Sequence, residues 1–137
     1  MIDELVEKYP NDLRVVIKHL PLGNHKQAKK AAMYSIAAER QGKFLEMEHK
    51  IFDNYRQLRN NEDLPRQYAE EMGLDMAKFD KDMQDPALGA RINKETKQLR
   101  NSGMQRIAVP KFLINGKEPQ GRSLAIYSSI IEAELKK

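Results

Sequence analysis

The stretch that decides the fold of this chain is Arg106-Ile107-Ala108-Val109-Pro110-Lys111-Phe112-Leu113-Ile114-Asn115-Gly116. Pro110 has no N–H for a sheet ladder, so it belongs at the first residue of a strand or at a sheet edge. Asn115 and Gly116 tolerate the positive φ of a type I′ turn and form a strong hairpin signal. The stretch therefore predicts a strand over 111–115 that turns back into a short partner over 117–121. The Val109–Pro110 bond is a candidate cis peptide, because the free-energy cost of the cis form is small only for X–Pro bonds. A trans bond is the alternative.

Composition limits the classes of protein to consider. The 137 residues suit one domain, and the net charge of +4 comes from interspersed acids and bases rather than from a one-sided basic stripe. We therefore expect no nucleic-acid partner. The sequence shows no apolar run of bilayer length and no signal-peptide segment, so we expect no membrane partner. It contains no cysteine, which excludes disulfides, thiolate catalysis and cysteine metal sites for this polypeptide.

Outside that stretch the apolar spacing is mostly helical, with one β-branched segment near the start. Leu13–His19 is compact and β-branched, which predicts a strand covered on both faces. Asn24, Asp63, Asp75, Asp85 and Ser123 stand where helix N-caps are expected. The predicted helices cover 1–9, 26–41, 43–59, 63–72, a segment from Asp75 that includes Met83, 85–101, and a last segment from Ser123 that includes Leu135. The order predicts an α/β protein with a helical insertion.

Several strings of this sequence resemble the DsbA-like branch of the thioredoxin superfamily. They are Val16-Ile17-Lys18-His19-Leu20-Pro21-Leu22, Gln41-Gly42-Lys43-Phe44-Leu45-Glu46-Met47, Met72-Gly73-Leu74-Asp75 and Val109-Pro110-Lys111-Phe112-Leu113-Ile114-Asn115-Gly116. The resemblance spans almost the whole chain and implies a single DsbA-type domain over 1–137 that is incomplete at its N-terminus. In it, 26–102 form the helical insertion, and 13–19 with 106–137 form the thioredoxin-fold parts.

The resemblance also implies a function. The family carries out thiol–disulfide exchange through a Cys-x-x-Cys motif, which on this comparison would lie upstream of Met1. The chain as given would then be redox-inactive, need no cofactor or metal, and bind a polypeptide substrate or partner chain through Val109 and Pro110, the match to the family's cis-proline pair. Enzyme status stays open, because the catalytic cysteines are absent. So does the compartment: the family is commonly periplasmic or extracytoplasmic, but this chain carries no signal peptide.

A strand missing from the middle of the sheet would leave two unpaired edges. Several unpaired buried main-chain groups, at about 1–3 kcal/mol each, rival the net stability of a domain. We therefore expect a homo-oligomer, possibly domain-swapped. Two other classes stay open: a non-catalytic peptide-binding or oligomerising thioredoxin-like module, and a helical assembly or small-ligand protein with a pocket within 26–101.

Other polar side chains have simpler interpretations. Glu46 and His49 have the Glu-x-x-His spacing, but only one copy is present where a di-iron site needs two, so we predict no metal. His19 and His25 flank the strand-to-helix turn without a nucleophile and are interpreted as structural or solvated. Basic residues on the first insertion helix are interpreted as a solvated face, with an acidic partner as the alternative; they are Lys26, Lys29, Lys30, Arg40 and Lys43.

Overall fold

The structure is a computed structural model that describes residues 1–104 and 107–137. It divides into two compact units. The first contains Met1–Ile17 and Gln105–Lys137, and the second contains Lys18–Met104. Arg106, the first residue of the predicted 106–137 segment, lies outside the described residues.

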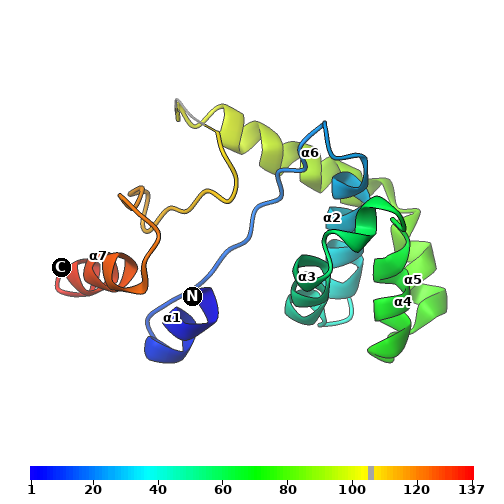
Figure 1. Cartoon of the computed structure of the whole chain (residues 1–137), viewed down its shortest axis with the longest axis horizontal. Helices are drawn as coiled ribbons and strands as arrows, with labels where there is room; N and C mark the ends of the chain where they lie inside the picture. Colours follow the sequence, from blue (N-terminus) through cyan, green and yellow to red (C-terminus); the bar gives the residue numbers. More distant parts are fainter. Residues whose placement is uncertain (105–106) are drawn as a thin grey trace. The chain divides into compact units, whose positions relative to one another are not determined.

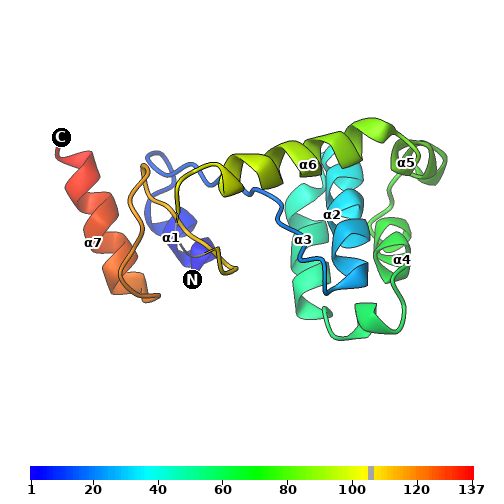
Figure 2. The ribbon, with the colours of Figure 1, turned by 90° about the horizontal axis from the view of Figure 1, so that it is seen from above.

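The second unit is helical. Its elements are α2 (Lys26–Glu39), α3 (Phe44–Asp53), the 3₁₀ turn η1 (Gln57–Arg59), α4 (Leu64–Glu71), α5 (Met76–Met83) and α6 (Pro86–Arg100). α2 contacts each of the other helices of the unit, and Figure 2 shows α3 beside it and α6 lying crosswise to it. Buried alanines on α2, among them Ala37 and Ala38, allow these neighbours to approach closely. Phe79 and Met47 fill the core and are fully buried.

The helix starts show which capping predictions hold. The side chains of Asp75, Asp85 and Ser123 each accept a main-chain N–H of the first turn, which confirms them as N-caps. Asn24 is not a cap, because the helix begins after His25. Asp63 stands at the N-cap of α4 but accepts the Tyr34 hydroxyl at 2.7 Å instead.

The predicted helix over 43–59 is wrong in its second half. α3 ends at Asp53, and the amide of Asn54 donates to the Lys50 carbonyl at 2.9 Å. This side-chain bond competes with the main-chain donor that would continue the helix. A separate 3₁₀ turn over Gln57–Arg59 then follows.

The first unit pairs two helices with a turn (Figures 1 and 2). These are α1 (Ile2–Lys8) and α7 (Leu124–Leu135), and they meet around buried Leu5, Tyr127 and Ile131. At their edge the Tyr9 hydroxyl donates to Glu132 at 2.7 Å. Apolar burial of this kind provides the stability of the unit.

The predicted hairpin turn is confirmed, but its strands are not. Asn115 and Gly116 have φ of 46° and 82°, and Ile114 and Lys117 exchange two main-chain hydrogen bonds of 2.9 Å. This isolated bridge is the whole of the β-pairing within residues 1–104 and 107–137.

The expected α/β architecture is therefore corrected to a helical one in the part of the chain that the structure describes. The segment 13–19 is extended but unpaired rather than a covered strand, and Val16 is 59% exposed. A strand needs a neighbouring strand to satisfy its N–H and C=O groups, and among the described residues no strand lies beside 13–19.

Candidate functional site

The Val109–Pro110 segment of the first unit is exposed, and the chain bends there. Its peptide bond is cis, and Val109 is 42% exposed. Within the described residues, the only hydrogen bond to this pair is donated by Arg122, from Nη2 to the Pro110 carbonyl oxygen at 3.0 Å. The main-chain groups of Val109 form no hydrogen bond within the described residues.

A hollow of about 200 Å³ opens beside Pro110, and we call it the Pro110 hollow. Phe112 and Tyr127 form part of its wall, with ring centroids 5.6 Å apart and an edge-to-face geometry. Lys111 forms an ion pair with Glu118 at its edge. The lining residues are Ala108, Pro110, Lys111, Phe112, Glu118, Pro119, Gly121, Arg122 and Tyr127.

Tyr127 is the most enclosed ring of the hollow. It is 3% exposed, and burial raises the pKa of its hydroxyl, while the positive charge of Arg122 acts in the opposite direction. The hydroxyl forms no hydrogen bond with another residue that the structure describes. The wall therefore carries the Lys111–Glu118 ion pair, the Arg122 guanidinium and the Tyr127 hydroxyl beside apolar groups.

Gly121 shapes the same hollow. Its φ is 137°, a conformation that residues with a Cβ rarely adopt, and an added Cβ would stand 2.6 Å from Ile126 Cδ1. Glycine is therefore required for the chain to pass this close to α7.

In the second unit, His19 forms a buried polar cluster that the sequence analysis missed. Glu95 Oε2 accepts the His19 main-chain N–H at 2.7 Å and lies 2.8 Å from Nδ1. Nε2 lies 4.0 Å from Glu48 Oε1 and has no hydrogen bond in the described part. Burial by itself would raise the pKa of Glu95, but bonds from His19 and Arg91 outweigh it and hold that pKa below its usual range. Seventy-six residues separate His19 from Glu95, so local spacing gave no signal of the pair.

The other proposed polar residues are spread over the second unit. His25 is exposed at the start of α2. Glu46 pairs with Lys43 rather than acting with His49 on a ligand. Among the described residues, no group of three histidine, aspartate or glutamate side chains has the geometry of a metal site.

The basic residues of the first insertion helix are partly paired. Lys30 binds Glu62 and Asp63, and Arg40 binds Asp82 and Asp85. A second hollow, of about 510 Å³, lies within 26–101, which is where a small-ligand protein would need one. Its lysine, arginine and aspartates already pair with one another; it is lined by Lys30, Met33, Tyr34, Asp63, Arg66, Asp80, Met83 and Gln84.

Comparison with known proteins places the chain in a family. A family model described as Thioredoxin matches residues 1–133. The chain belongs to the thioredoxin family.

The chain is also similar to curated proteins that are named as antiporters. The chain is 32% identical over 119 residues to a protein named Na(+)/H(+) antiporter NhaA from Herminiimonas arsenicoxydans, covering 87% of this chain and 18% of that protein. It is 34% identical over 123 residues to Na(+)/H(+) antiporter NhaA 1 from Mycolicibacterium vanbaalenii, covering 88% and 19%. The chain thus spans about a fifth of the length of these relatives. In the described residues no helix is long and apolar enough to span a bilayer. No solved structure gives a significant match.

Proposed function

We propose that this chain is the polypeptide-binding part of a DsbA-like protein-disulfide oxidoreductase domain. It holds an extended substrate segment against Val109 and Pro110. The observation that supports the proposal is the thioredoxin family match over 1–133 together with the exposed Val109 beside the Pro110 hollow.

The binding mode follows from the main chain. No main-chain hydrogen bond forms over 107–109 in the described structure, so these groups can pair with an added strand. Pro110 ends the donor row, because it has no N–H. A short extended peptide would therefore gain its affinity from the main chain of Ala108 and Val109.

The chemistry of disulfide exchange needs sulfur that this chain lacks. A thiolate attacks one sulfur of a disulfide, a new disulfide forms, and the other sulfur leaves as a thiolate. None of the 137 residues is a cysteine. The proposal therefore assigns binding to this chain and assigns the electron transfer to thiols outside it.

The test has a catalytic arm and a binding arm. We expect the pure chain to leave the rate of insulin reduction by dithiothreitol unchanged. A fluorescent peptide, acetyl-Thr-Val-Gln-Val-Thr amide, should bind by anisotropy and lose affinity on Val109→Pro, which removes a main-chain donor. Val16→Pro, at another exposed valine of the same unit, is the matched control. Accelerated insulin reduction, no peptide binding, or equal losses in the two variants would each contradict the proposal.

A second candidate function rests on the relatives. Their names describe Na(+)/H(+) antiporters, and the alignments cover most of this chain but about a fifth of each antiporter. We propose as the alternative that this is a non-catalytic thioredoxin-like module that accompanies such a transporter. Reading the genomic sequence on both sides of the coding region separates the two. An in-frame Cys-x-x-Cys stretch supports the oxidoreductase, and in-frame membrane-spanning segments support the transporter module.

A further inference from the structure

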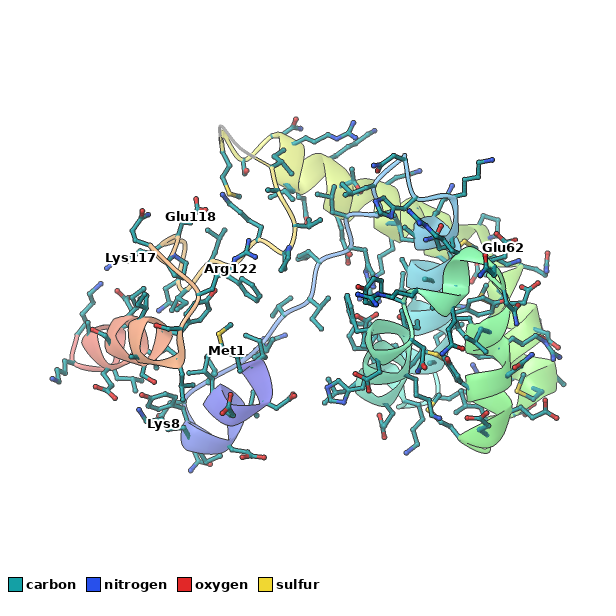
Figure 3. All side chains as sticks on the ribbon, viewed as in Figure 1. Met1, Lys8, Glu62, Lys117, Glu118 and Arg122 are labelled. Atoms are coloured by element: carbon teal, nitrogen blue, oxygen red, sulfur yellow. The ribbon has the colours of Figure 1, made fainter. Side chains whose placement is uncertain are left out.

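The Pro110 hollow carries an unmatched positive charge. Its charged lining residues are Lys111, Glu118 and Arg122. Lys111 and Glu118 form an ion pair, whereas no carboxylate lies within ion-pair distance of Arg122 in the described part. Figure 3 shows Arg122 on the chain segment that follows Glu118.

Arg122 is positioned by one hydrogen bond, and its guanidinium keeps further N–H donors for a ligand. Its Nη2 donates to the Pro110 carbonyl at 3.0 Å, which fixes the guanidinium beside the exposed Val109 segment. A guanidinium has five N–H donors, so several remain for a ligand. The planar fork of these donors matches a carboxylate in two-bond geometry.

Tyr127 supplies an independent second donor. It lines the hollow, is only 3% exposed, and its hydroxyl meets no acceptor among the described residues. The fully enclosed polar side-chain atoms without a partner in the described part include His19 Nε2 but not the Tyr127 oxygen, so this hydroxyl keeps contact with solvent and can donate to a ligand in the hollow. The hollow, at about 200 Å³, is several times the roughly 30 Å³ share of one liquid water, so it has room for a side-chain carboxyl.

We propose that the Pro110 hollow is a carboxylate subsite, in which Arg122 and Tyr127 bind a carboxylate of the polypeptide that lies along Val109. The inference rests on the proposed function and adds a substrate class to it: extended segments with an acidic residue. The carboxylate can come from an aspartate or glutamate side chain or from a chain terminus, and the test distinguishes these sources.

The experiment compares three fluorescent peptides on the full chain by anisotropy. They are acetyl-Thr-Val-Glu-Val-Thr amide, its Gln counterpart, and the Gln peptide with a free C-terminal carboxylate. We expect the Glu amide to bind about tenfold more tightly than the Gln amide, and the preference to shrink with added salt. Tighter binding of the free-acid Gln peptide instead would assign the subsite to a chain terminus.

Two variants locate the effect, and circular dichroism checks that each is folded. Arg122→Gln should reduce the Glu-over-Gln preference to about one, and Tyr127→Phe should reduce it in part. Arg59→Gln, which removes an equal charge from an exposed site in the second unit, should leave the preference unchanged.

The outcomes separate the two proposals. Equal binding of all three peptides, or a preference that survives Arg122→Gln, overturns the carboxylate subsite and leaves the peptide-binding function standing. Binding of none of them overturns the proposed function itself.

Discussion

Glu95 on α6 accepts the main-chain N–H of His19 at 2.7 Å and contacts its Nδ1 with the same oxygen at 2.8 Å. Both side chains are buried, at 6% exposure each. One carboxylate thus fixes the position of the segment that leads into α2. Because a buried group left without its partner keeps its full desolvation cost, loss of either member of this pair is costly.

Removal of the Glu95 side chain should therefore lower the free energy of unfolding of the second unit. We expect Glu95→Ala to lower the free energy of unfolding by about 3 kcal/mol, measured by urea denaturation followed by circular dichroism. Glu70→Ala, at an exposed position on α4, should change it by less than about 0.5 kcal/mol. Similar effects of the two variants would show that the His19 contact does not stabilise the unit.

The core of the second unit offers a comparison between two phenylalanines. Phe79 is fully buried and stacks on Tyr34 at 5.9 Å, whereas Phe52 is 67% exposed. We expect Phe79→Ala to cost about 4 kcal/mol, from lost burial and the cavity it leaves. Phe52→Ala should cost less than about 0.5 kcal/mol in the same denaturation experiment. A large effect at Phe52 would contradict the assigned burial.

A substitution of Gly121 would test the packing beside the Pro110 hollow. We expect Gly121→Ala to destabilise the first unit by about 2 kcal/mol, because of its positive φ and the contact with Ile126. In an Ile126→Val background, which lacks Cδ1, part of this loss should disappear. Gly23→Ala is the control, since a Cβ there meets nothing within 4 Å. No recovery in the Ile126→Val background would assign the whole cost to backbone strain.

The hairpin turn carries a pH-dependent contact. Hydrogen bonds from Lys117, Lys137 and Asn115 lower the pKa of Glu134 from 4.5 to about 2. Because the folded-state pKa lies below the unfolded one, this stabilisation is present above pH 4.5 and is lost as the pH falls toward 2. NMR titration of the Glu134 carboxyl should show the low midpoint. In Lys117→Gln the midpoint should move toward 4.5, and an unchanged midpoint would contradict the assignment.

The exposed segment over 15–17 provides a test for self-association. Val15, Val16 and Ile17 are 37–59% exposed and have no main-chain partner in the described structure, and such edges pair with other chains. We expect light scattering across a dilution series to show a homo-oligomer that Val16→Lys weakens. Phe52→Lys, in the second unit, should leave it intact. A monomer at all concentrations would contradict the expectation.

The sequence by itself determined the features that depend on a few neighbouring residues. Asp75, Asp85 and Ser123 cap helices because each side chain reaches an N–H two or three residues ahead, and Asn115-Gly116 forms its turn because both residues adopt positive φ. The sequence strings that resemble the DsbA-like branch also indicated the thioredoxin family, which the family match shows.

Only the tertiary structure decided what depends on distant partners. The β-branched pattern of 13–19 favours extended backbone, but whether it pairs depends on a strand from elsewhere, and in the described residues none is there. Likewise His19 meets Glu95 across 76 residues, and Arg122 reaches the Pro110 carbonyl across 12. Local propensity sets backbone conformation, whereas these contacts form where the packed helices and turns place the groups.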